Sequence, residues 1–351
     1  MSASLAALCL VWGLWPLVAF AGGLGFAPLI GLAALIALVD VARPAARARL
    51  RLRAYMAPLC AFLLLAAISA FWSPRPAALL EVDLAAGEVH VRSEVARIAL
   101  GLLCGAVLIA AASGLRPGQA RVLGWIAIVA LTVQTLIVMG LAAFESEALA
   151  LFAPLMSDPA EGVQNITRNS LILAMASPAL LVFAARAHPI GLLFAGVMAI
   201  LQASALSVRG VEAGLLALGA AAAAIGVARV LPRSGFRVIG TAMAVAVLAM
   251  PLAVERLAPP PQAEAATSAQ WRLLIWSRAL EEVEAEPYLG QGVGALRTIE
   301  DRIEAGPFAG QRLIPNHPHN MPIQLWAETG LAGALLLAAA LLLAAWRLPR
   351  P

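Results

Sequence analysis

The segment that decides the fold is residues 323–346, IQLWAETGLAGALLLAAALLLAAW, in which Glu328 is the only ionisable side chain. An apolar run of about 18 or more residues is long enough to cross a bilayer as a helix. Lipid offers no hydrogen-bond partners to the backbone, so such a run must satisfy its own peptide groups, as a helix does. The segment therefore predicts a transmembrane helix.

The rest of the chain repeats this pattern. Of the 351 residues, 62% are hydrophobic and 13% charged, with a mean hydropathy of +0.88, whereas soluble domains are about half apolar and about a quarter charged. We therefore predict an all-α integral membrane protein of about ten transmembrane helices. The other predicted spans are residues 5–21, 24–42, 55–72, 96–113, 122–143, 169–186, 190–206, 211–228 and 238–254.

The charges indicate which way the spans run. All 24 basic residues are Arg, and short cytoplasmic loops of membrane proteins are rich in basic residues. With the N-terminus inside, the loops on that side contain no Asp or Glu and carry Arg43, Arg47, Arg49, Arg51, Arg53, Arg116, Arg121, Arg229, Arg233, Arg237, Arg347 and Arg350. Both termini are therefore predicted to be cytoplasmic. Because the arginines are divided among loops, the net charge of +4 does not indicate nucleic-acid binding.

This topology divides the chain into three parts: nine spans in 1–254, a large outer loop in 255–322, and the last span with a short tail in 323–351. The loop should contain a helix from about Ser268 to Glu284, because apolar residues recur there at helical spacing. That spacing also suits a helix lying on a membrane surface. Glu286-Pro287 should end this helix, and Gly290, Gly292 and Gly294 should form a turn.

Two histidines, His317 and His319, stand where the loop meets the last span. They are either an interfacial polar cap or a catalytic base, since imidazole exchanges protons near neutral pH. A metal site is the weaker reading, because the pair supplies two ligands and no Cys or further His is near in sequence. No metal is predicted.

Several arginines face the same outer side. Arg209, in the turn between two spans, either extends to the lipid headgroups or binds phosphate through its planar donors. Arg272 and Arg168 admit the same two readings. Arg278 lies six residues after Arg272 on another helix face and is a weaker candidate.

Two further features carry weaker signals. Glu328 lies within the last span, where an ionisable group usually faces the protein interior and is either functional or a structural hydrogen-bond partner. The Gly-x-Gly-x-Gly pattern of residues 290–294 is weak evidence for a phosphate cradle, because no strand precedes it and no helix follows directly.

Four segments within residues 71–333 together match a known pattern. They are Phe71-Trp72-Ser73-Pro74-Arg75-Pro76; Ser207-Val208-Arg209-Gly210; Arg272 with Trp276 and the segment Glu286 to Gly294; and His319-Asn320 with Gln324, Glu328, Thr329, Gly330 and Gly333. In these segments the chain resembles the O-antigen ligase and polysaccharide polymerase superfamily of bacterial inner membranes. It departs from the family in having one predicted span after the large loop, where members often have more.

The resemblance implies a membrane glycosyltransferase of GT-C-like architecture that is inverting and needs neither metal nor other cofactor. It implies that the donor is a glycan on undecaprenyl diphosphate and that the acceptor is a sugar hydroxyl of lipid A-core. Membrane lipids are expected to surround the protein, and the active site is expected on the periplasmic face. It assigns Arg209 and Arg272 to the donor diphosphate and His319 to the catalytic base. Secondary candidates are Arg168, His317, Glu328 and Asn320.

Two alternatives stay open. A repeat-unit polymerase of O-antigen or exopolysaccharide shares this residue set, with a lipid-linked glycan as the acceptor. A polytopic lipid or glycan transporter belongs to a different class, which inverted repeats or charges in mid-membrane would favour.

Overall fold

The computed structural model describes residues 2–43, 56–75, 81–83, 88–90, 94–155, 159–208, 210–257, 267–303, 306, 309–314 and 317–347. The chain packs as two compact units. Unit 1 comprises residues 1–51 and 102–230, and unit 2 comprises residues 52–101 and 231–351. The predicted boundaries at residues 254 and 322 concern topology across a membrane, which this packing does not test.

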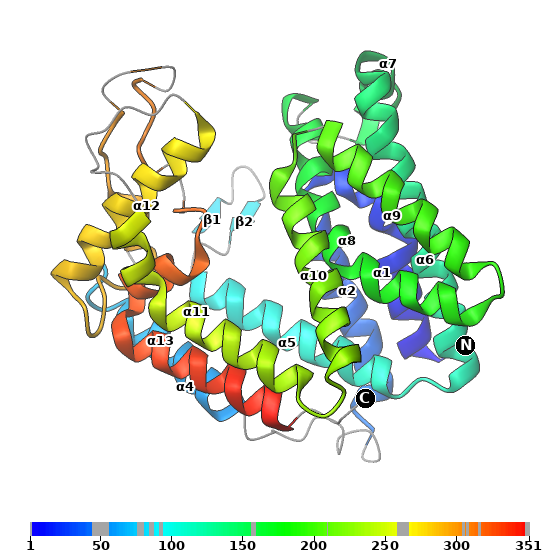
Figure 1. Ribbon diagram of the computed structural model, residues 1–351, viewed down its shortest axis with the longest axis horizontal. Coiled ribbons are helices and arrows are strands. Elements are labelled where there is room, and N and C mark those ends of the chain that lie inside the picture. Colours follow the sequence, from blue (N-terminus) through cyan, green and yellow to red (C-terminus); the bar gives the residue numbers. More distant parts are fainter. Residues whose placement is uncertain are drawn as a thin grey trace. The chain divides into compact units, whose positions relative to one another are not determined.

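A helix coincides with each of the ten predicted spans (Figure 1). These helices are α1 (Ala3–Val18, extended by the 3-10 turn η1, Ala19–Ala21), α2 (Gly23–Val41), α4 (Met56–Ser69), α5 (Glu94–Ser113), α6 (Pro117–Ala143), α8 (Pro159–Ala187), α9 (Gly191–Val208), α10 (Glu212–Val230), α11 (Gly235–Leu257) and α13 (Met321–Arg347). Among the described residues, eight helices are long and apolar enough to cross a membrane, and shorter apolar helices cover Gly25–Val41 and Met56–Ser69. The predicted class, an all-α multi-pass membrane protein, is confirmed. The count of ten spans and the GT-C-like architecture stay predictions.

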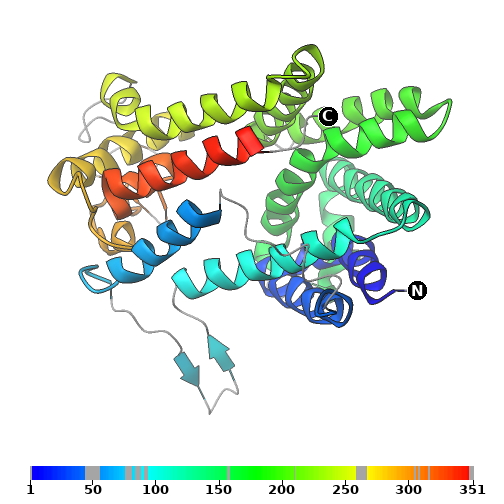
Figure 2. The same cartoon turned by 90° about the horizontal axis from the view of Figure 1, so that it is seen from below.

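The remaining elements are short, apart from the helix of the large loop. They are α7 (Glu145–Phe152), η3 (Ala153–Leu155), α12 (Ser268–Ala285), η4 (Ala295–Thr298) and the strands β1 (Glu81–Asp83) and β2 (Glu88–His90). The two strands form an antiparallel hairpin in which Val82 pairs with Val89, and Figure 2 shows the hairpin apart from the helices of unit 2.

Unit 1 is held together by small residues between its helices. Ala7 of α1 and Ala33 and Ala37 of α2 are fully buried in its core, and small side chains allow membrane helices to approach closely. Trp15 fills the remaining space and packs edge-on against Phe26, with the ring centroids 4.5 Å apart.

In each unit, one pair of predicted cytoplasmic helix ends is in contact. In unit 1 the amide of Ser4, at the start of α1, donates to Asp40 near the end of α2 at 2.8 Å. In unit 2 the guanidinium of Arg237, at the start of α11, lies 5.6 Å from the ring of Trp346, at the end of α13. These contacts agree with the predicted alternation of the spans. Which side is cytoplasmic stays a prediction.

Among the helices of unit 2, α11 and α13 lie side by side in both views (Figures 1 and 2). The indole Nε1 of Trp326 on α13 donates to the carbonyl of Val247 on α11 at 2.8 Å. Pro251 lacks the N–H that would normally bond to this carbonyl four residues earlier. Because lipid cannot supply a donor, the tryptophan satisfies the carbonyl that the proline leaves open.

The helix predicted at Ser268–Glu284 is α12, and its end before Pro287 is confirmed. Thr267 caps its N-terminus in a capping box with Gln270. Its apolar face is buried in a core that includes Val254 of α11 and Ile323 of α13. This overturns the suggestion that this face lies on a membrane surface, because protein side chains cover it.

Candidate active site

Helix α13 is broken at Gly330, whose backbone angles are φ 61° and ψ −163°. This region is essentially open to glycine alone. A segment that follows α12, residues 286–294, which we call the clasp loop, supplies hydrogen bonds at the break. The amides of Gln291 and Gly292 donate to the carbonyls of Ala327 and Glu328, and the amides of Leu331 and Ala332 donate to the carbonyls of Pro287 and Tyr288, at 2.8–3.1 Å.

The other side of the clasp loop is bound by the end of α4. The indole Nε1 of Trp72 donates to the carbonyl of Gly290 at 3.0 Å, and the hydroxyl of Ser73 donates to the carbonyl of Val293 at 2.9 Å. The amide of Val293 in turn donates to the hydroxyl of Ser69 at 3.0 Å. The Trp-Ser-Pro element, the clasp loop and the Glu-Thr-Gly break, which are three of the segments behind the family resemblance, therefore form one hydrogen-bonded assembly within unit 2.

This assembly explains the three glycines of the clasp loop. Gly290, Gly292 and Gly294 have φ values of 69°, 93° and 77°, which favour glycine. A Cβ at Gly290 would lie 2.5 Å from the backbone of Glu328, and one at Gly292 would lie 2.7 Å from the carbonyl oxygen of Ser69. The suggested phosphate cradle gains no support, because two of these glycines serve close backbone packing.

His319 lies in the loop just before α13, exposed and with a left-handed φ of 54°. The indole Nε1 of Trp276 on α12 donates to the carbonyl of the preceding residue, Pro318, at 2.8 Å. The ring of His317 lies beside that of His319, with centroids 4.4 Å apart. The histidine pair is thus anchored to α12 through the residue between its members.

Asn320 has a structural role. Its side-chain oxygen accepts from the amide of Ile323 at 3.2 Å and so caps the start of α13. Its amino group contacts the sulfur of Met250 on α11 at 3.3 Å. These contacts fix the residue that follows His319.

Arg272 lies one helical turn before Trp276, on the same face of α12. It is half-buried, and within the described parts of the chain it forms no ion pair or hydrogen bond. A half-buried guanidinium without a protein anion is available to an anionic ligand. It lies one turn from the indole that anchors the His319 loop.

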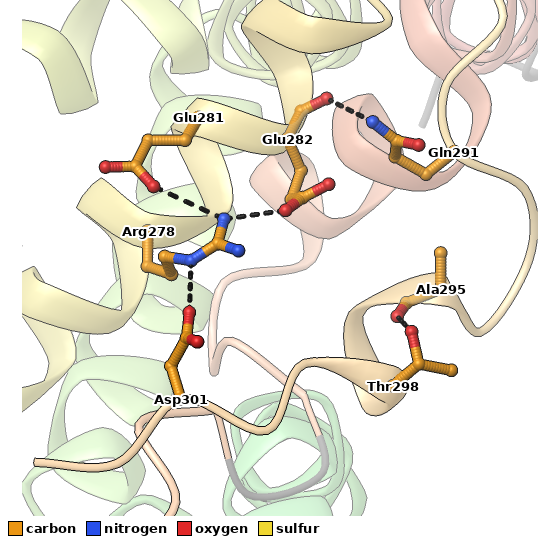
Figure 3. A network of polar contacts seen from close by, with 7 residues as sticks. All are labelled: Arg278, Glu281, Glu282, Gln291, Ala295, Thr298 and Asp301. Atoms are coloured by element: carbon orange, nitrogen blue, oxygen red, sulfur yellow. Dashed lines mark hydrogen bonds and ion pairs between the residues drawn. The ribbon is translucent and has the colours of Figure 1, made fainter. Parts of the chain in front are cut away.

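Arg278, six residues further along α12, is in the opposite situation (Figure 3). Its guanidinium contacts Glu282 and Asp301 at 2.6 Å and Glu281 at 3.3 Å. Burial alone would lower the pKa of Arg278, but its bonds and charge interactions with Asp301 and Glu282 outweigh this and raise it. Its ranking below Arg272 as a ligand-binding candidate agrees with these contacts, because carboxylates already occupy its donors.

We expect Arg278→Ala to destabilise the protein. The substitution leaves three carboxylates without their cation and separates α12 from the segment that carries Asp301. A loss of about 1–2 kcal/mol follows for a partly exposed network, which would lower the melting temperature of the purified protein by a few degrees. Arg272→Ala is the matched control on the same helix and should leave the melting temperature unchanged. Equal shifts for both variants would contradict the structural assignment of Arg278.

Glu328 is buried, with 6% of its surface exposed, as expected for an ionisable residue facing the protein interior. Its carboxylate accepts from the amide of Gln324 one turn earlier on α13 at 3.1 Å, while its backbone carbonyl holds Gly292. The hydrogen-bonded alternative is thus present, and a catalytic role for Glu328 stays a prediction.

The two remaining candidates belong to unit 1. Arg168 is an exposed residue of α8. Arg209 lies outside the described residues. The turn around it closes in the usual manner of a helix end, since Gly210 has a φ of 64° and the amide of Val211 donates to the carbonyl of Leu206 at 2.8 Å. The meeting of Arg209 with Arg272 and His319 in one site therefore stays a prediction.

The fold and the clustered motifs define a multi-pass membrane protein. Residues 167–338 match the model of a family described as O-antigen ligase. This match, which covers just under half of the chain, confirms the resemblance to the O-antigen ligase-like superfamily and supports an enzyme with activity of the ligase or polymerase type. No curated protein and no solved structure matches the chain. The matched segment contains Arg168, Arg209, Arg272 and His319, whereas the Trp-Ser-Pro element lies before it and is joined to it by the clasp-loop contacts.

Proposed function

We propose that this protein is a glycosyltransferase of the bacterial inner membrane that moves a glycan from undecaprenyl diphosphate to a sugar hydroxyl of lipid A-core at the periplasmic face. The family match supports the reaction type. The observation that carries the assignment of residues is that Arg272 has no hydrogen-bond or ion-pair partner among the described residues and lies one helical turn from the tryptophan that anchors the His319 loop.

In the proposed reaction His319 accepts the proton of the acceptor hydroxyl. The acceptor oxygen then attacks the anomeric carbon, a new glycosidic bond forms, and the bond between that carbon and the diphosphate oxygen breaks. The electron pair leaves with undecaprenyl diphosphate, and attack opposite the leaving group inverts the anomeric configuration. The guanidinium groups of Arg272 and Arg209 neutralise the charge that grows on the diphosphate. The proposal needs no metal or other cofactor for this step.

The exposed position of His319 suits this role, because an incoming acceptor can reach it. Arg272 suits its role because a partly desolvated guanidinium binds phosphate oxygens more strongly than one in open water. Arg168, His317, Glu328 and Asn320 remain secondary candidates in this proposal.

We expect Arg272→Ala to lower the rate of glycan transfer about 100-fold, the usual cost of removing one preorganised group that stabilises transition-state charge. Arg272→Lys should recover part of the activity, since it keeps the charge and loses the two-pronged geometry. The measurement is transfer of a lipid-linked glycan to lipid A-core by the purified protein in liposomes. Arg209→Ala should lose at least as much.

Arg278→Ala is the matched control for this assay. At a temperature well below its melting point it should keep most of the wild-type rate, because its guanidinium is engaged by Glu282 and Asp301. Normal transfer by Arg272→Ala would remove Arg272 from the donor site.

The product distinguishes the ligase from a polymerase of the same superfamily. A ligase joins the glycan to lipid A-core, so its deletion removes all glycan from surface lipopolysaccharide. A polymerase lengthens the lipid-linked glycan, so its deletion leaves lipopolysaccharide that carries a single repeat. A single-repeat phenotype would replace the proposed acceptor with a second lipid-linked glycan.

A further inference from the structure

Unit 1 contains a group of buried polar side chains at the centre of its helices. They are Gln134 and Thr135 of α6, Ser170 of α8 and Gln202 of α9, each with 2–7% of its surface exposed. They line a cavity of about 20 Å³ together with apolar residues such as Leu131 and Leu173. A cavity of this size admits about one water molecule.

Both hydroxyl groups in this cluster already use their hydrogen. Ser170 donates to the carbonyl of Ile166 at 2.8 Å, and Thr135 donates to the carbonyl of Leu131 at 2.8 Å. The hydroxyl oxygen of Ser170 accepts a hydrogen bond from the side-chain amino group of Gln134, and that of Thr135 accepts one from Gln202, each at 3.3 Å. No hydroxyl hydrogen remains to be donated into the cavity.

The side-chain oxygens of the two glutamines are the remaining hydrogen-bond acceptors of this cluster. Gln134 Oε1 and Gln202 Oε1 are buried and have no hydrogen-bond partner within the part of the chain that the structure describes. An unsatisfied buried acceptor costs about 1–3 kcal/mol, and lipid around the helices cannot satisfy it. Rotating either amide by half a turn would replace an unpaired oxygen with an unpaired amino group. Both glutamines line the cavity. A ligand that donates two hydrogen bonds would therefore satisfy both of their side-chain oxygens.

We propose that an ordered water molecule occupies this cavity and donates its two hydrogens to Gln134 Oε1 and Gln202 Oε1. The water thereby links α6 to α9. Water has the required size, its two donors match the two acceptors, and it carries no charge. A monovalent cation fits less well, because none of the residues lining the cavity is acidic and an unbalanced charge at membrane depth is costly.

The position of the site gives the water a structural consequence. Gln202 lies on α9 five residues before Ser207, where the Ser-x-Arg-Gly turn begins. A bridge from Gln202 to α6 fixes the axial position of α9 within unit 1. This inference stands independently of the proposed reaction.

The first test is a double-mutant cycle on the purified full-length protein. Methionine has nearly the volume of glutamine and lacks its amide, so Gln134→Met and Gln202→Met remove one acceptor each without opening a larger hole. Each single variant should lower the melting temperature by about 2–4 °C. The double variant should lose clearly less than the sum, because it removes both acceptors and so leaves neither one unsatisfied. Losses that simply add would overturn the bridge.

The second test is a density map that resolves ordered water in the wild-type protein in lipid nanodiscs. We expect one peak within hydrogen-bonding distance of both glutamine oxygens, absent in the double variant. Thr132→Val is the control, because this α6 hydroxyl bonds to the carbonyl of Ile128 and does not line the cavity; it should keep the peak. An empty cavity in the wild type overturns the proposal. So does a melting temperature that rises when sodium or potassium replaces choline, since that result identifies a cation.

Discussion

We expect His319→Asn to abolish detectable glycan transfer, with a rate at least about 1,000-fold below wild type, and to leave the melting temperature of the protein unchanged. Removing a general base costs about 10²–10⁴ in rate, and no other group then takes the proton from the acceptor hydroxyl. Asparagine is the informative replacement because His319 has a φ of 54°, and Asn tolerates this left-handed conformation. The loss can therefore be ascribed to the imidazole and not to misfolding of the loop.

His317 supplies the matched control. Its ring lies 4.4 Å from that of His319, and both residues are exposed in the same loop. His317→Asn should change the transfer rate no more than a few-fold, since the proposal gives it no proton to move. Full activity of His319→Asn, or loss confined to His317→Asn, would remove His319 from the role of base.

We expect Gly330→Ala to prevent the protein from folding normally. At a φ of 61° and a ψ of −163° the backbone occupies a region that costs a residue with a Cβ about 1–3 kcal/mol. The added Cβ would also clash with the carbonyl carbon and oxygen of Tyr288 and with the amide nitrogen of Leu289. These are backbone atoms and cannot rotate away, so the clasp loop must separate from α13 and leave its hydrogen bonds broken. The combined cost should exceed about 4 kcal/mol, the range seen for the most damaging substitutions.

Size-exclusion chromatography and thermal unfolding of the detergent-solubilised variant measure this effect. Gly290→Ala tests the facing side of the same contact, since its Cβ would lie 2.5 Å from the backbone of Glu328. Gly219→Ala on α10 is the control, because nothing lies within 4 Å of its added Cβ and its stability should change by about 1 kcal/mol or less. Wild-type behaviour of both Gly330→Ala and Gly290→Ala would show that the clasp loop does not hold the break in α13.

Much of the architecture could be predicted because the tendency of a segment to form a membrane-spanning helix depends on the hydrophobicity of consecutive residues. The run at 323–346 and its nine counterparts coincide with helices, and the helix predicted from about Ser268 to Glu284 in the large loop is observed as Ser268–Ala285. The burial of Glu328 could be anticipated for the same reason, since a charge within a span avoids lipid. The surface placement suggested for α12 was wrong because an apolar stripe does not specify whether lipid or protein covers it.

The local sequence was enough to predict the class of protein, its helices and, through its motifs, its family resemblance. The tertiary structure alone decided which polar groups meet. Trp72 and Gly290, whose hydrogen bond joins α4 to the clasp loop, are separated by 218 positions, and spacing within the glycine pattern could not reveal that its partners are Ser69 and Glu328. Arg272 and Arg278 are chemically identical, yet packing gives three carboxylates to one and none to the other among the described residues. The physical reason is range: helix formation and lipid partition follow local composition, whereas a hydrogen bond requires two groups to be brought within about 3 Å by the whole fold.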